Sequence, residues 1–110
     1  MSASSWPVLA RWELPADLPC FAGHFPGRPM LPGALLLDWV IDALEGSSAS
    51  AVATVAQCKF LAPAEPGACL ALHAQGERFE VRLWPGPSLE ANSPRVAASG
   101  VVRWRQDGRA

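Results

Sequence analysis

The sequence has little of what marks a nucleic-acid-binding protein. Charged residues make up 17% of the 110-residue chain, and the formal net charge is −1. A chain this close to neutral carries no basic field to attract phosphates, so we expect no nucleic-acid partner. The arginines near the C-terminus are interpreted as a solvated chain end rather than a phosphate-binding patch; they are Arg103, Arg105 and Arg109.

Long apolar runs are also lacking. The most apolar stretch, residues 34–44, is far shorter than the roughly 20 residues that cross a bilayer, and it contains Asp38 and Asp42. Residues 1–6 have neither the basic start nor the apolar centre of a signal peptide. We therefore expect a cytoplasmic protein that does not contact a membrane.

Cysteine and histidine are too few and too scattered for a metal site. Cys20, Cys58 and Cys69 are odd in number and lack C-x-x-C spacing. This pattern predicts reduced thiols that pack as small hydrophobic side chains. The chain has only two histidines, and neither lies near a cysteine pair, so we predict no bound metal.

What the chain does have is apolar content and a clear order of elements. Half of the residues are apolar, which predicts one globular domain over residues 1–110. Residues 15–32 contain five prolines and form a stiff loop, since proline lacks a backbone donor and fixes its own φ. Residues 33–45 then form a helix that ends at Gly46, and because it is apolar on nearly all sides we predict that it is buried all round.

The rest of the chain reads as strands. Alternating or β-branched patterns predict them at residues 7–14, 51–60, 69–75, 79–84 and 95–105, with a hairpin turn at Gly76-Glu77. His73 lies in one of these strands and is interpreted as structural. The simplest packing is an α+β fold in which an antiparallel sheet of five to six strands wraps around one central helix. Such a sheet leaves an open edge, so we expect a dimer.

Two polar residues stand out against this background. His24 lies in a loop rich in glycine and proline, where a fixed backbone can aim the ring as a general base. Asp38 follows fourteen positions later, inside the apolar helix. Burial favours the protonated form of a carboxyl group, which makes Asp38 a candidate acid.

Each of these residues also has a structural reading. His24 can be a loop histidine bonded to the backbone, and Asp38 can belong to a water-facing side of the helix together with Asp42 and Glu45. Gly33 favours the functional reading, because free N–H groups at a helix start can stabilise an oxyanion. A base, an oxyanion donor and an acid are the set needed to remove a proton beside a thioester carbonyl and expel a β-hydroxyl.

The segment "GHFPGRPMLPGALLLD" resembles the signature of the 3-hydroxyacyl-[acyl-carrier-protein] dehydratases, which carry G-H-F-P-x-x-P-x-x-P-G and then Glu or Asp fourteen positions after the histidine. A second segment, "KFLAPAEPGACLAL", resembles that family's next strand and turn. The resemblance implies the hot-dog fold, an antiparallel sheet around a long helix, paired into a dimer. The "LDWV" ending is most similar to dehydratases of aryl polyene and related pigment pathways.

Carried over to this chain, the resemblance implies a role for each matching residue. His24 takes the C2 proton, the Gly33 N–H binds the thioester oxygen, and Asp38 protonates the leaving hydroxyl. The main-chain oxygen near Met30 accepts from the other ring nitrogen of His24. Phe25, Pro32 and Met30 complete the substrate-binding set. The facing histidine and acid come from different subunits.

The implied reaction turns a 3-hydroxyacyl thioester into a trans-2-enoyl thioester and water, as in fatty acid or polyene biosynthesis. It needs no cofactor, and the acyl chain arrives on the phosphopantetheine of acyl carrier protein or coenzyme A. Expected partners are acyl carrier protein and a second copy, or a homologous hot-dog subunit. Two alternatives stay open: a hot-dog thioesterase and a non-catalytic partner subunit. Asp38 stands where most plain dehydratases have Glu, and the chain has no tyrosine to gate a tunnel.

Overall fold

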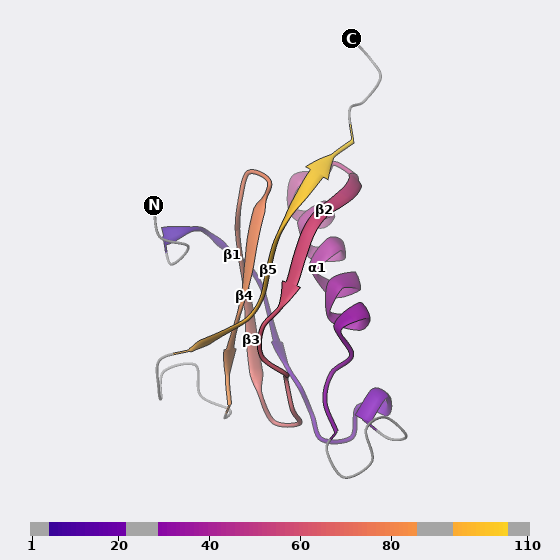
Figure 1. Cartoon of the computed structure of the whole chain (residues 1–110), viewed down its shortest axis with the longest axis vertical. Helices are drawn as coiled ribbons and strands as arrows, with labels where there is room; N and C mark the ends of the chain where they lie inside the picture. The colour runs from indigo at the N-terminus through magenta and orange to yellow at the C-terminus, as the bar shows by residue number, and fades with distance from the viewer. Residues whose placement is uncertain (1–4, 22–28, 86–93, 106–110) are drawn as a thin grey trace.

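The protein folds as one antiparallel sheet with one long helix on its inner face (Figure 1). The structure, a computed structural model, describes residues 5–21, 29–85 and 94–105. In chain order the elements are β1 (Val8–Glu13), the 3-10 turn η2 (Pro19–Phe21), α1 (Gly33–Ser48), β2 (Val52–Phe60), β3 (Cys69–Gln75), β4 (Arg78–Trp84) and β5 (Arg95–Trp104). The five strands lie in the order β1-β3-β4-β5-β2, and all neighbours are antiparallel. The predicted α+β layout is confirmed.

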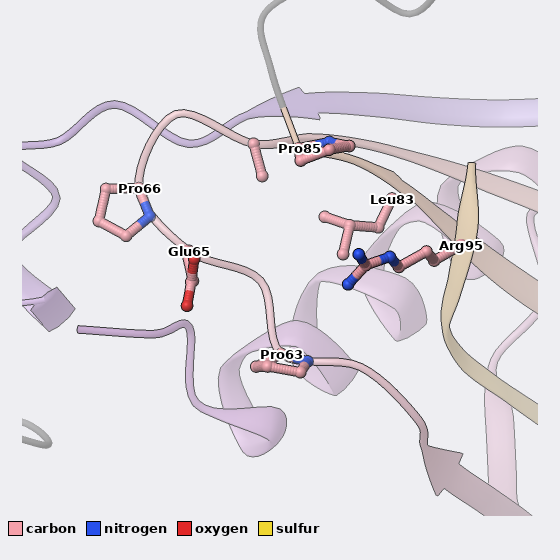
Figure 2. Close-up of a pocket in the computed structure, with 7 residues that line it drawn as sticks. Pro63, Glu65, Pro66, Leu83, Pro85 and Arg95 are labelled. Atoms are coloured by element: carbon pink, nitrogen blue, oxygen red, sulfur yellow. The ribbon is translucent and has the colours of Figure 1, made fainter. Parts of the chain in front are cut away.

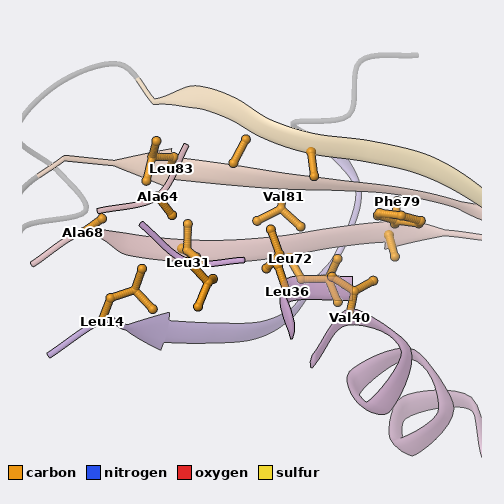
Figure 3. Packing of buried hydrophobic residues seen from close by; sticks show 14 of the residues in the cluster. Leu14, Leu31, Leu36, Val40, Ala64, Ala68, Leu72, Phe79, Val81 and Leu83 are labelled. Atoms are coloured by element: carbon orange, nitrogen blue, oxygen red, sulfur yellow. The ribbon is translucent and has the colours of Figure 1, made fainter. Parts of the chain in front are cut away.

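The core lies between the inner face of the sheet and one stripe of α1. On β4 every second side chain is buried, as the alternation predicted, and a helical stripe spaced by four residues packs toward it (Figure 3). The members of these two rows are Phe79, Val81 and Leu83 on β4, and Leu36, Val40 and Leu44 on α1. Burying each such side chain contributes about 1.5–3 kcal/mol, so this contact fixes the position of the helix on the sheet.

The helix is not buried all round, and that prediction was wrong for the single chain. Ala34, Asp38 and Asp42 are exposed and share the side of α1 that faces away from the buried stripe. The reason is that one five-stranded sheet covers only one side of a helix. In the isolated chain, Asp38 therefore lies on a water-facing side of the helix, as the structural alternative predicted.

The helix also runs past its predicted end at Gly46. It continues to Ser48 and stops at Ala49, which adopts a left-handed conformation with φ 59°. The Glu45 carboxylate accepts a hydrogen bond of 2.7 Å from the Val52 N–H. This bond ties the last turn of α1 to the start of β2, which can hold a glycine inside the helix despite its cost of roughly 1 kcal/mol.

Within the described ranges, the sheet has two open edges, β1 and β2. Strand β2 is nine residues long, and Lys59 is its one charged residue. Charged residues are a common device that protects a sheet edge from pairing with another strand. Because a single charged residue protects it, the edge of β2 is available to pair with a strand of a second chain.

The interpretation of His73 as a structural residue can be tested by substitution. It lies on β3 with 8% of its surface exposed, and its Nδ1 has no hydrogen-bond partner among the described residues. A buried polar atom without a partner costs about 1–3 kcal/mol. We expect His73→Leu to leave the free energy of unfolding unchanged or raise it by about 1 kcal/mol in urea titrations, and His73→Ala to lower it through a cavity. A large loss with leucine would show that the imidazole makes a needed polar contact.

Candidate active site

The start of α1 presents unused backbone donors. Pro32 is the N-cap residue and supplies no side-chain cap. Its carbonyl oxygen accepts from the N–H groups of Leu35 and Leu36, both at 3.1 Å. Gly33 and Ala34 are the first two residues of the helix, so their N–H groups have no acceptor within it. Free N–H groups at the positive end of the helix dipole can stabilise a developing negative charge on a carbonyl oxygen.

An apolar pocket of about 240 Å³ opens beside this helix start. Its lining comes from the segment before α1, from α1 itself, from the end of β2 with its following loop, and from β5: Met30, Leu31, Gly33, Leu36, Phe60, Leu61, Ala62, Pro63, Ala64 and Ala97. Two predicted substrate-binding residues, Met30 and Gly33, are thus brought together. Pro32 caps the helix next to the pocket but is not among its lining residues. Among the described residues, the lining contains no charged side chain, and it therefore suits a hydrocarbon chain.

The walls of this pocket are held by backbone hydrogen bonds. The Leu31 N–H donates to the carbonyl of Ala64 at 2.7 Å. The N–H groups of Leu61 and Ala62 donate to the carbonyl of Ala97 at 2.8 and 3.3 Å. The loop after β2 is therefore fixed both to the segment that enters α1 and to β5, which gives the pocket a pre-formed shape.

Phe60 covers the helix start, and the sequence interpretation gave it no role. A Cβ placed on Gly33 would lie 3.1, 3.1 and 3.2 Å from Cε1, Cζ and Cε2 of Phe60. Nearly equal distances to three ring atoms mean that the face of the ring lies over Gly33. The segment "KFLAP" carried the signal, since Phe60 is the aromatic residue of that motif.

The two candidate acid-base residues are not brought together by the described part of one chain. Asp38 is exposed and does not line the pocket. His24 and Phe25 lie outside the described residues. The pairing of His24 with Asp38 remains a prediction, and the exposed position of Asp38 leaves its carboxylate accessible to a second subunit.

A second hollow, of about 280 Å³, shares Pro63 with the first pocket (Figure 2). It is lined by the loop between β2 and β3 and by the adjoining ends of β4 and β5: Pro63, Glu65, Pro66, Ala68, Leu83, Pro85 and Arg95. The guanidinium of Arg95 points into it, whereas Glu65 belongs to the opposite loop. The charged side chains of this lining are one cation, Arg95, and one anion, Glu65, and Arg95 offers a contact to an anionic group. Sequence reasoning missed Arg95 because no motif marked it.

Two of the three cysteines are poorly suited to act as nucleophiles. Cys20, Cys58 and Cys69 are reduced thiols that form no disulfide, as predicted. Burial raises the pKa of the Cys58 thiol. Burial also raises the pKa of the Cys69 thiol, with a smaller contribution from the negative charge of Glu13. Because a thiolate is the reactive form, these two thiols are poor nucleophiles near neutral pH.

The described part of the chain contains neither a metal-binding cluster nor a membrane-spanning helix. Its His, Cys, Asp and Glu side chains form no group of three or more that could hold a metal ion. Within the same ranges, no helix has the length and apolar character needed to span a bilayer.

A five-stranded antiparallel sheet curved along one long helix defines the hot-dog fold, here with an apolar pocket at the helix start. The model of one family, ApeI-like, described as ApeI dehydratase, matches residues 2–84. The chain belongs to this family.

Relatives and solved structures agree with that assignment. The chain is 31% identical over 94 residues to the 3-hydroxyacyl-[acyl-carrier-protein] dehydratase FabZ of Alkalilimnicola ehrlichii, over 68% of this chain and 61% of that protein. An uncharacterized protein of Erwinia carotovora is 29% identical, with a TM-score of 0.63 over 86% of this chain and 79% of that one. The dehydratase heterocomplex ApeI:P of Xenorhabdus doucetiae shares the fold, with a TM-score of 0.63 and 20% identity over 93% and 99% of the two chains.

The match to the FabZ enzymes is partial. The chain spans 61% of the Alkalilimnicola protein and 45% of a 36%-identical FabZ of Haemophilus influenzae.

Proposed function

We propose that the protein dehydrates 3-hydroxyacyl thioesters to trans-2-enoyl thioesters. One observation carries the proposal: Gly33, whose N–H has no acceptor within α1, lines an apolar pocket that can hold an acyl chain. Membership of the ApeI-like family and similarity to FabZ enzymes support the same reaction class. The chemistry requires only proton transfers and charge stabilisation, so we expect no cofactor beyond the carrier that bears the substrate.

Protons and charges balance in the proposed steps with the residues named above. The Gly33 N–H holds the thioester oxygen and stabilises the enolate that forms when His24 removes a C2 proton. Asp38 then gives a proton to the C3 hydroxyl as it leaves as water, and the C2–C3 double bond forms. His24 passes its proton back to the carboxylate through solvent, which restores both groups. The main-chain oxygen near Met30 fixes the histidine tautomer.

The site is proposed to form between two subunits. Asp38 faces away from its own sheet, so a His24 loop from a second subunit can approach it without displacing the core. The open edge of β2 offers the strand pairing that would place such a subunit. We infer a dimer of two copies or of this chain with a homologous hot-dog subunit.

The test is incubation of the purified protein with a 3-hydroxyacyl carrier protein, followed by mass spectrometry. Loss of one water supports the proposal, whereas release of a free acid and a thiol would assign a thioesterase instead. The Xenorhabdus heterocomplex motivates a second candidate, a partner subunit that needs another chain. Turnover that appears only after a homologous subunit is added would favour that candidate.

Arg95 supports delivery of the substrate on a phosphate-bearing carrier, which we take to be acyl carrier protein in the cytoplasm. We expect Arg95→Glu to raise the KM for carrier-bound substrate about fivefold, since an exposed charge contact is worth roughly 1 kcal/mol. The KM for an N-acetylcysteamine thioester, which has no phosphate, should stay the same. Arg103→Glu is the control, because Arg103 lies on the same strand but pairs with Glu77 at 2.8 Å. Equal effects on both substrates would contradict the phosphate contact.

A further inference from the structure

Two large apolar side chains are exposed next to each other at the pocket beside the helix start. Phe60 is 52% exposed and Leu61 is 57% exposed, and both line this pocket. Val8, at 37%, is the third large hydrophobic residue exposed in the described part of the chain, and it lies on β1 outside the pocket. Adjacent exposed apolar groups at a cavity point to contact with an apolar ligand or partner rather than to a role in the core.

The ring of Phe60 has one side already occupied. Its face lies over Gly33, close enough that a Cβ there would have to displace it by a few tenths of an ångström. Glycine at the first helix position therefore allows the ring to approach. Phe60 as a whole is half exposed and lines the pocket, so part of its side chain is available to a ligand.

This placement relates Phe60 to particular atoms of the proposed substrate. If the Gly33 N–H holds the thioester oxygen, C2 and C3 lie next to it along the acyl chain. The ring that covers Gly33 then forms the wall beside those carbons. Because Gly33 supports the Phe60 ring on one side, the ring limits the width of the substituent that C3 can carry.

We propose that Phe60 is a specificity-determining residue that sets the width of the acyl pocket beside C3. This inference rests on the proposed function, because it takes Gly33 as the thioester contact. The wild-type pocket selects an unbranched chain over a bulky C3 substituent. Removing the ring widens the pocket beside C3. Changes of this kind in an apolar pocket alter the ratio of kcat/KM between two substrates by roughly 10- to 200-fold.

The experiment compares two N-acetylcysteamine thioesters, 3-hydroxybutyryl and 3-hydroxy-3-phenylpropionyl. For Phe60→Ala we expect the ratio of kcat/KM, phenyl over butyryl, to rise about tenfold or more above wild type. Phe60→Leu should give a smaller rise in the same direction and serves as the deciding variant if the alanine protein has an altered circular dichroism spectrum. Val8→Ala, which also trims an exposed apolar residue, is the control and should not change the ratio.

The outcomes separate this inference from the proposed function. Equal losses for both substrates in the Phe60 variants would show a structural role and overturn the inference. If wild-type protein does not release water from either thioester, the proposed function fails. Calorimetric Kd values for the saturated butyryl and 3-phenylpropionyl thioesters then decide the inference alone. A phenyl-to-butyryl affinity ratio that rises in Phe60→Ala supports it, and an unchanged ratio overturns it.

Discussion

Asp38→Asn is expected to lower kcat/KM for dehydration by about 10²- to 10⁴-fold, the usual contribution of a positioned acid or base. Asparagine has the same shape but cannot give a proton to the departing hydroxyl. Since Asp38 is exposed in the single chain, the substitution should change the free energy of unfolding by less than about 0.5 kcal/mol. Water loss followed by mass spectrometry and a urea titration measure the two quantities.

Asp42→Asn is the matched control for this prediction. Asp42 lies one turn further along the same exposed side of α1, so it has a similar environment and charge but lies farther from the helix start. We expect it to keep wild-type kcat/KM within about twofold, as for a surface substitution. A similar loss in both variants would assign the effect to the charge of the helix surface and would remove Asp38 from the mechanism.

Mixing inactive variants tests whether the site is shared. His24→Ala and Asp38→Asn chains, unfolded together and refolded, should regain about a quarter of wild-type activity. Half of the dimers would then be mixed, and each mixed dimer has one intact site of two. No recovery from a mixture that forms mixed dimers would place both residues in one chain and contradict the site between subunits.

Gly100→Ala is expected to destabilise the fold by about 3 kcal/mol or more, at the upper end of the cost of overpacking a core. A Cβ at this position would overlap the backbone oxygen of Gln57 and lie 2.7 and 2.8 Å from ring atoms of Phe79. The oxygen belongs to β2 where it pairs with β5, and Phe79 is only 2% exposed, so neither can move cheaply. Urea-induced unfolding followed by circular dichroism measures the change.

Gly46→Ala is the control, because nothing lies within 4 Å of a Cβ at that position inside α1. Alanine there should raise the free energy of unfolding by about 0.5–1 kcal/mol through its higher helix propensity. If Gly100→Ala were tolerated as well as Gly46→Ala, the close packing of β5 against β2 and Phe79 would be wrong.

Local pattern was enough to predict most of the fold. The alternation of Phe79, Val81 and Leu83 predicted which side of β4 is buried, because successive side chains in a strand point to opposite faces. Pro32 and Gly33 predicted where α1 begins, because proline suits the edge of a helix and not its interior. The end of α1 was missed, since the bond from Val52 to Glu45 connects residues that local pattern does not pair.

The sequence by itself determined the elements, the candidate residues of the site and the family resemblance, because these depend on short-range spacing and on residue type. Only the tertiary structure decided what lies around those residues. Phe60 meets Gly33 across 27 positions of sequence, and Asp38 faces outward because one sheet covers one side of a helix. Such contacts depend on how separate elements pack against each other. The local pattern of residues along the chain does not encode that packing.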